Sequence, residues 1–310
     1  MIKKILAISL LLSVIFLAKV EASFENTYWG ARPLAMGGAY TAVANDANAP
    51  LYNIAGIANV VQKEFTFMSS KLFTGVEGVD IGSNYLSFVY PVFSQQYGAI
   101  SFTWASVSAT SVWREDIFNI GYARQVNDIF NLDTNIINMT AGLNLKYLMQ
   151  EANFDVEDRD LPSSKGAPTC DVGILAQFTN GLSVGLSSKY LTSPDVGYVT
   201  QNTVYNTNVL GLAYYSDEIP FIKIPFFTVA MDVILRNNET NIKFGLESYV
   251  IEGKLALRTG FREEAFCFGF GYEHEFQNGT KMIFDYALEM PTQVQETLGS
   301  HFVGLSFRFA

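Results

Sequence analysis

The chain has 310 residues, with 20 basic and 30 acidic side chains and a formal net charge of −10. Hydrophobic residues make up 49% of it, aromatic residues 14% and charged residues only 16%, against about 25% charged residues in an ordinary soluble domain. An acidic chain without clusters of Lys and Arg binds polyanions poorly, so we expect no nucleic-acid partner. Its two cysteines exclude a disulfide framework and a cysteine-rich zinc module.

Residues 1–22 have the pattern of a secretory signal peptide. Lys3 and Lys4 form a basic start, and residues 5–18 form an apolar run that is too short to span a bilayer. Val20 and Ala22 then stand three residues and one residue before a cleavage site. We therefore predict that the chain is exported and cleaved after Ala22.

Residues 23–61 predict a compact segment rather than strands. Residues 30–59 are rich in small side chains and show no alternation of polar and apolar positions. Glycines in this stretch suit tight turns, and short polar side chains can satisfy the backbone groups of such a segment. The residues of these two kinds are Gly37, Gly38, Gly56, Asn45, Asp46, Asn48 and Asn53.

Residues 62–310 read as a succession of strands of about ten residues with strict alternation, which is the signature of a transmembrane barrel. In residues 265–276 one face carries Phe266, Phe268, Phe270, Tyr272, His274 and Phe276, and the other Cys267, Gly269, Gly271, Glu273 and Glu275. A soluble sandwich also alternates, but its buried face is aliphatic and its exposed face is dense in charge. The long aromatic faces opposite small residues therefore favour a barrel.

The segments number fourteen, an even count that places both ends of the barrel on the periplasmic side. They are residues 62–71, 80–92, 98–107, 115–125, 136–150, 169–179, 182–192, 204–216, 222–236, 240–250, 253–262, 264–276, 280–290 and 299–309. All nine prolines are expected before the barrel, in loops or near strand ends, where they remove no mid-strand ladder bond. We predict an all-β protein, a transmembrane antiparallel β-barrel of about 14 strands in the bacterial outer membrane.

Both ends of the chain carry a more specific pattern. The N-terminal stretches are Gly37-Gly38-Ala39, residues 41–49 and residues 52–57, and the C-terminal ones are residues 284–287 and 301–309. Together they resemble the FadL-type outer-membrane transporter superfamily, and most closely its PorV/PorQ branch. The family usually has Asn-Pro-Ala-Gly where this chain has Asn53-Ile54-Ala55-Gly56. The final alternating strand is similar to the signal that the barrel assembly machinery reads.

The resemblance implies a fourteen-stranded barrel whose lumen is plugged by an N-terminal hatch, residues 23–61, within a barrel of residues 62–310. The implied hatch residues are Gly37, Gly38, Asn45, Asp46, Asn53, Ala55 and Gly56. FadL-type members pass hydrophobic molecules, fatty acids above all, by diffusion through the hatch and a lateral opening. PorV-type members instead bind exported proteins of a secretion system at the cell surface.

We expect passive transport of hydrophobic small molecules such as long-chain fatty acids, and the secretion role is the alternative. Transport predicts an apolar pocket that ends at the hatch. The expected partners are outer-membrane lipids, a hydrophobic substrate and the barrel assembly machinery during biogenesis, with secretion-system proteins in the alternative.

The residues predict no enzyme, cofactor or metal site. The chain has only two histidines, His274 and His301, and a lipid-cleaving enzyme would need Ser, His and a carboxamide side chain together. Ser300 beside His301 is the one conceivable start of such a site. No phosphate-cradling loop or metal-ligand spacing is present in the sequence.

Four basic side chains fall on the predicted lumen faces of neighbouring segments: Lys243, Lys254, Arg258 and Arg262. Such a stripe would hold the carboxylate head group of an amphiphile. Acidic side chains on lumen faces are Glu247, Glu273, Glu275 and Asp285. In a second interpretation, these acidic side chains pair with the basic stripe in an internal salt-bridge network that fills the barrel. We favour this second interpretation.

Overall fold

The computed structural model describes residues 24, 29–78, 80–93, 97–110, 112–152, 164–198, 200–218, 225–251, 253–262, 265–294 and 296–310. The predicted signal peptide lies outside these residues, so its removal stays a prediction. Within the described ranges, no helix combines the length and the apolar character needed to cross a membrane.

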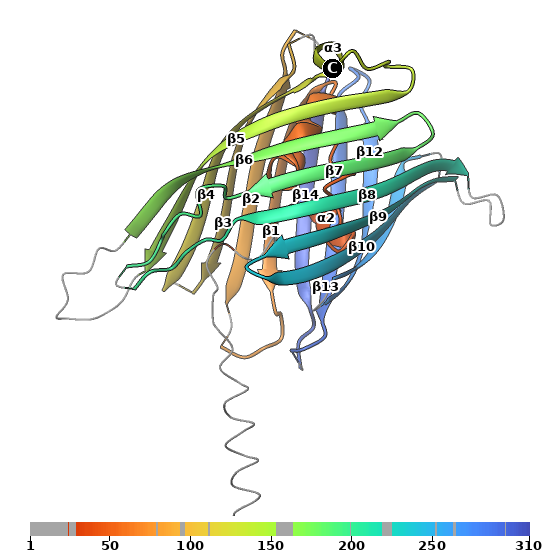
Figure 1. Ribbon diagram of the computed structural model, residues 1–310. Helices are drawn as coiled ribbons and strands as arrows, with labels where there is room; N and C mark the ends of the chain where they lie inside the picture. Colours follow the sequence, from red (N-terminus) through yellow and green to blue (C-terminus); the bar gives the residue numbers. More distant parts are fainter. Residues whose placement is uncertain are drawn as a thin grey trace, which may run out of the picture.

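Fourteen antiparallel strands close into a barrel (Figure 1), in which each strand pairs with its neighbours in sequence and β1 pairs with β14. The strands are β1 (Lys63–Leu72), β2 (Ile81–Pro91), β3 (Ala99–Ala109), β4 (Trp113–Gln125), β5 (Ile137–Ala152), β6 (Ser164–Phe178), β7 (Leu182–Lys189), β8 (Thr207–Glu218), β9 (Pro225–Arg236), β10 (Glu239–Val250), β11 (Leu255–Arg262), β12 (Ala265–Glu275), β13 (Lys281–Pro291) and β14 (Ser300–Phe309). A one-turn helix, α3 (Asn127–Phe130), lies between β4 and β5. The predicted fold class is confirmed.

The predicted boundaries are wrong around β6 and β7. β6 begins at Ser164, well before the predicted residue 169, so Pro168 lies inside a strand rather than in a loop. β6 pairs with β7 only from Val172 to Gln177, and the Pro168 carbonyl accepts a hydrogen bond from Thr192 on the segment that follows β7. The nitrogen and carbonyl of one antiparallel residue face the same side, so Pro168 removes no ladder bond to β5.

Side chains alternate between the exterior and the lumen along the strands. On β12, Phe266 and Phe268 are each 49% exposed, whereas Cys267 between them is buried, as predicted from the period of two. On β10, Phe244 and Leu246 face outward and Glu247 is buried. A closed barrel with large apolar side chains on its outside is suited to lipid surroundings.

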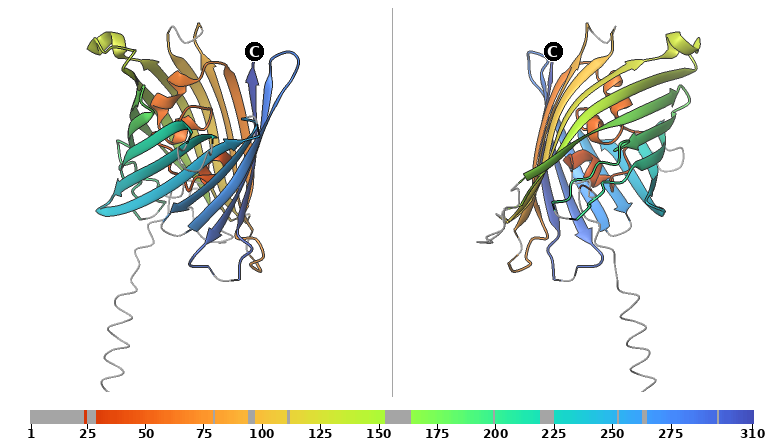
Figure 2. Two further views of the ribbon diagram at one scale, coloured as in Figure 1. Left: turned by 90° about the vertical axis from the view of Figure 1, so that its right-hand side faces the viewer. Right: turned by 60° about the vertical axis from the view of Figure 1, so that its left-hand side comes forward.

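Residues 29–60, here called the N-terminal segment, lie inside the barrel, where Figure 2 shows them in red and orange. The segment contains α2 (Ala31–Ala35) and two 3-10 helices, η1 (Ala49–Leu51) and η2 (Ile54–Asn59). Most of its side chains are buried. Asn53 caps η2, since its side-chain oxygen accepts a hydrogen bond from the Ala55 nitrogen.

Small residues on the lumen wall let the backbone of this segment approach closely. A Cβ on Gly260 of β11 would stand 2.2 Å from the Gly37 nitrogen and 2.2 Å from the Met36 carbonyl carbon. Gly37 has φ +63°, and a Cβ there would stand 2.7 Å from the Phe261 nitrogen, so glycine is needed on both sides of the contact. Other wall glycines within contact distance of the segment are Gly121, Gly142, Gly173, Gly185, Gly211, Gly245, Gly269 and Gly304.

Candidate functional site

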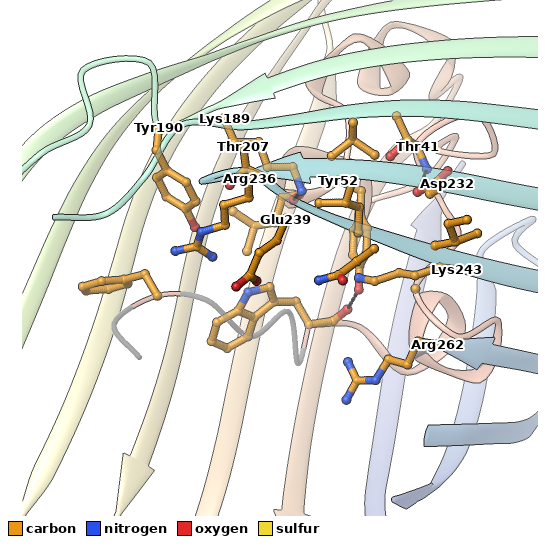
Figure 3. A pocket seen from close by; sticks show the side chains of 18 of the residues that line it. Thr41, Tyr52, Lys189, Tyr190, Thr207, Asp232, Arg236, Glu239, Lys243 and Arg262 are labelled. Atoms are coloured by element: carbon orange, nitrogen blue, oxygen red, sulfur yellow. Dashed lines mark hydrogen bonds between the residues drawn. The ribbon is translucent and has the colours of Figure 1, made fainter. Parts of the chain in front are cut away.

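A pocket of about 350 Å³ lies in the lumen between the N-terminal segment and strands β5 and β7 to β11 (Figure 3). It is at the end of the barrel where β8 begins and β9 ends, opposite the end that carries the C-terminus. By the predicted orientation this is the extracellular end. The labelled lining residues are Thr41, Tyr52, Lys189, Tyr190, Thr207, Asp232, Arg236, Glu239, Lys243 and Arg262.

The pocket ends at the N-terminal segment, but its lining is not the apolar one that we expected. Both aromatic rings and cations line it. The Lys189 ammonium donates to the Leu51 carbonyl at 2.7 Å and lies 5.5 Å from the centroid of the Tyr52 ring. Lys146 lies 4.7 Å from the centroid of the Tyr190 ring. Charges gather here because lumen faces, unlike the exterior, need not be apolar.

The charges of the pocket differ in how they are partnered. Arg262 pairs with Glu289 at 2.5 Å, and Lys146 pairs with Asp171. Asp232 accepts hydrogen bonds from the Tyr40 and Thr41 nitrogens, both at 3.0 Å, and so holds the N-terminal segment against β9.

Lys243 lies opposite Asp232 and Arg262 in the strand register, yet its ammonium forms no hydrogen bond or ion pair with any residue that the structure describes. Its neighbour on the N-terminal segment is Gly38, where a Cβ would stand 3.2 Å from Nζ. Lys243 therefore presents a positive charge to the pocket.

A second cluster, the Arg32 cluster, ties the N-terminal segment to β10, β11 and β13. Arg32 binds both carboxylate oxygens of Glu247, at 2.8 and 2.9 Å, and donates to Asp46 at 2.9 Å. Arg258 donates to the same Glu247 at 2.6 Å and to Asp285 at 2.7 Å. Because every member is buried and paired, the cluster is a rigid anchor rather than a ligand site.

Asp46 is the acidic member of this cluster that comes from the N-terminal segment itself. Burial alone would raise the pKa of Asp46, but the Arg32 guanidinium and the Tyr40 hydroxyl, which donates at 2.8 Å, hold that pKa below its ordinary value. Burial raises the pKa of the Tyr40 hydroxyl well above its ordinary value. Asp46 is thus ionised and Tyr40 neutral at physiological pH.

The four predicted lumen cations do not meet in one anion site. Arg258 belongs to the Arg32 cluster, and Arg262 is paired with Glu289. Lys254 lines a separate cavity of about 20 Å³ beside Glu64 and Glu273. β11 separates Lys254 from Arg262 by eight residues, or about 26 Å of strand, so one small anion cannot touch both. Of the four, only Lys243 and Arg262 line the larger pocket.

The predicted hatch residues all lie in the N-terminal segment, where they make local contacts. Asn53 donates to the Thr41 and Ile174 carbonyls at 2.9 and 3.0 Å, and Asn45 accepts from Arg32 at 2.8 Å. A Cβ on Gly56 would stand 2.3 Å from the Ala44 carbonyl oxygen. The remaining ones, Gly37, Gly38, Asp46 and Ala55, take part in the contacts described above.

Sequence reasoning missed Arg32, Asp232 and Lys189, which hold the segment or line the pocket. The available signal was a charge at a lumen position of an otherwise apolar strand, as for Asp232 in β9. The alternation of side chains along β9 alone could have singled out Asp232 as a charged lumen residue.

Ser300 and His301 do not form a catalytic pair. The Ser300 side chain is buried and accepts a hydrogen bond from the Phe73 nitrogen at 3.1 Å. The His301 ring takes part in a hydrogen bond of 2.7 Å with the Tyr286 hydroxyl. Neighbouring residues of a strand point to opposite faces, so the two side chains are on different sides of the wall. The described ranges also contain no group of three or more acidic, histidine or cysteine side chains that could hold a metal ion.

No profile of a known protein family matches the sequence, and no curated protein does. Among solved structures, the chain is similar to the Ralstonia pickettii toluene transporter TbuX, with a TM-score of 0.56 and 11% identity over 91% of this chain and 98% of that one. It is similar to the Pseudomonas putida toluene transporter TodX, with a TM-score of 0.53 and 13% identity over 90% and 96%. It is also similar to the monoaromatic hydrocarbon channel CymD, with a TM-score of 0.55 and 12% identity over 90% and 96%. At these identities the likeness is one of fold, and the chain shares the barrel fold of these channels along about nine-tenths of its length.

Proposed function

We propose that the protein is a channel of the bacterial outer membrane through which hydrophobic small molecules pass by diffusion, with the N-terminal segment as its hatch. One observation carries the proposal: a closed barrel with an apolar exterior encloses a pocket of about 350 Å³ whose floor is the N-terminal segment. The fold shared with hydrocarbon channels and toluene transporters supports the substrate class. Long-chain fatty acids are the substrates that the FadL-type resemblance implies.

The assignment of a hatch rests on how the segment is held. It is bonded to strands on several sides of the lumen, through Glu247, Asp232 and the Asn144 side chain, which donates to the Pro50 carbonyl at 2.6 Å. Between the segment and the barrel end that carries the C-terminus, the cavity beside Lys254 measures only about 20 Å³. Passage to the periplasm therefore requires the segment or a neighbouring part of the wall to move.

At one place in the wall, such a movement would break few hydrogen bonds between strands. β6 and β7 share only six register pairs, from Val172 to Gln177. Beyond them the chain after β7 covers β6, through a bond from the Leu191 nitrogen to the Cys170 carbonyl. A lateral exit here would break a few loop contacts instead of a full strand ladder.

The proposal involves no covalent chemistry, which agrees with the separation of Ser300 from His301 by the barrel wall. Export through a cleaved signal peptide and insertion by the barrel assembly machinery belong to the same proposal. The PorV/PorQ-like secretion role is the alternative outcome of the experiment below.

The experiment is uptake into vesicles that contain the purified protein, with toluene and oleate as separate probes. We compare Val209→Phe with Leu210→Phe, because these neighbours on β8 face the pocket and the exterior respectively. The expected result is protein-dependent uptake that Val209→Phe reduces and Leu210→Phe leaves unchanged, with both variants migrating as folded barrels in unheated gels. Absence of uptake of both probes, together with a protein partner that co-purifies in stoichiometric amount, would overturn the channel and favour the secretion role.

A further inference from the structure

The connection between β4 and β5 carries exposed apolar side chains at the barrel end where the C-terminus lies (Figure 1). By the predicted orientation this is the periplasmic end, where the turns of outer-membrane barrels are usually short. This connection instead contains the helix α3, and Ile129, Phe130 and Ile136 on it are each 59% exposed. Bulky apolar side chains gathered on one exposed surface indicate an interaction site.

The connection is held rigidly by its own polar groups. Asn127 is buried, and its side chain donates to the Ile137 carbonyl at 2.7 Å and accepts from the Met139 nitrogen at 2.8 Å. Asn131 ends α3 in the left-handed conformation, and its nitrogen donates to the Asn127 carbonyl. The Ile137 nitrogen donates to the Asp133 carbonyl at 3.0 Å. The exposed apolar side chains are therefore presented by a hydrogen-bonded frame.

The exterior of β4 shows where the bilayer lies relative to this connection. Near the other end of the strand, Asp116 pairs with Arg114 at 2.8 Å, and Arg124 lies on the same face close to α3. Asp116 and Arg124 are eight residues apart, or about 26 Å of strand, which is about 20 Å of height at the tilt of barrel strands. This is close to the apolar band of such barrels, about 25 Å, so Arg124 lies at a membrane interface. The exposed apolar side chains between the two charges are Phe118, Ile120 and Tyr122.

The helix α3 lies at the level of this interface and beside the lipid-facing wall. An ion pair of 2.5 Å between Arg124 and Asp128 ties α3 to the end of β4. Both views in Figure 2 show α3 at the outer margin of the barrel end rather than over the lumen. Nearby, the Tyr122 hydroxyl donates to the carbonyl of the exposed Tyr97 at 2.8 Å. Tyrosines at this level are typical of the aromatic belt at a membrane surface.

We propose that Ile129 and Phe130, here called the α3 tip, insert into the phospholipids of the periplasmic leaflet, with Arg124 at the level of the lipid phosphates. Apolar side chains that move from water to the boundary of headgroups and acyl chains gain free energy with the area they bury. Lipid is the occupant because the α3 tip continues the lipid-facing exterior of β4 at the same height. The inference goes beyond the proposed channel, since it concerns the outer surface and not what passes through the lumen.

The test is tryptophan fluorescence of the purified protein in phospholipid vesicles. Phe130→Trp places a reporter at the α3 tip, and subtraction of the wild-type emission removes the signal of Trp29, Trp104 and Trp113. Some vesicles contain phospholipids brominated near the top of the acyl chains, and iodide is the quencher added from the water. We expect brominated lipid to remove most of the added emission and iodide to change it little.

Two matched variants calibrate the measurement. Ile120→Trp lies on the exterior of β4, where the side chain is 64% exposed, and should be quenched by brominated lipid. Thr134→Trp lies on the same connection as α3 but between the exposed polar residues Asp133 and Asn135, and should be quenched by iodide. Folding of each variant is checked by its migration in unheated gels.

Quenching of Phe130→Trp by iodide and not by brominated lipid would overturn the proposal and leave the α3 tip to a periplasmic protein. Protection from both quenchers would indicate that a second copy of the chain covers the tip, which would also overturn it. Equal quenching of Thr134→Trp and Phe130→Trp by brominated lipid would overturn the assignment of insertion to the apolar tip.

Discussion

Gly260→Ala should detach part of the N-terminal segment from the wall without preventing the barrel from forming. The new Cβ would stand 2.2 Å from both the Met36 carbonyl carbon and the Gly37 nitrogen, and real Cβ atoms essentially never come within 3.0 Å of such atoms. Both obstacles are backbone atoms, so no rotamer change relieves the contact. The segment must therefore move away by about 1 Å, which disturbs its close packing on β11.

Overpacking of this kind costs about 1–3 kcal/mol. If the cost falls on the contact between segment and wall, local opening of residues 31–44 becomes about 5- to 150-fold more frequent. The assay is amide hydrogen exchange of the purified protein, followed by mass spectrometry of peptides from the N-terminal segment and from the strands. We expect faster exchange in the segment and unchanged exchange in β1 to β5.

The matched control is Gly304→Ala, a second lumen glycine that faces the same segment. Its Cβ would stand 3.2 Å from the Ala31 methyl carbon, a contact that a shift of a few tenths of an ångström relieves. The segment should therefore exchange nearly as in the wild type. Equal protection in both variants and the wild type would refute the reasoning, and so would faster exchange spread over all strands in Gly260→Ala.

Three further predictions concern the anchor and the exterior. Arg32→Met leaves Glu247 and Asp46 without their shared guanidinium and should lower the free energy of unfolding by about 3–5 kcal/mol in denaturant titrations; a loss below about 1 kcal/mol would contradict the anchor. The pKa of Asp46 is held below its ordinary value, so its stabilising contribution is complete above about pH 4 and is lost as the pH falls through that lowered pKa. The difference in unfolding free energy between wild type and Asp46→Asn should therefore be constant from about pH 5 to 8 and shrink below about pH 4, and a difference that grows on acidification would be inconsistent with it. Phe268→Lys places a charge on the exposed exterior of β12 and should cost about 2–4 kcal/mol in lipid vesicles, whereas Phe268→Leu should cost much less; equal costs would argue against lipid contact.

The strands could be predicted closely because their signal is local. Alternation along β10 and β12 reports which side chains face lipid, and the turns between strands are marked by Gly, Asn and Asp. The error at Pro168 also arises because the prediction used only local sequence. A proline is a poor strand residue by itself, and only the short ladder between β6 and β7 makes that position tolerant.

The candidate site could be predicted only in part. The small residues of the N-terminal stretch predicted a compact segment, and residues 29–60 lie inside the barrel. Parity assigned Lys243 and Arg258 to lumen faces; in the structure Lys243 lines the pocket and Arg258 is buried. Parity does not say how far apart lumen charges lie along the barrel axis or which acid each one meets. For that reason the four cations of the expected stripe divide among separate sites.

The sequence by itself determined the all-β class, the fourteen strands and the division of their side chains between two faces, because a period of two is a property of each strand alone. Only the tertiary structure decided which lumen groups meet. Arg32 and Glu247 are 215 residues apart in the chain, and they bond because the closed barrel brings β10 against α2. The same closure places Lys243 at the pocket, opposite Asp232 and Arg262 in the register, without a hydrogen bond or ion pair to any residue that the structure describes.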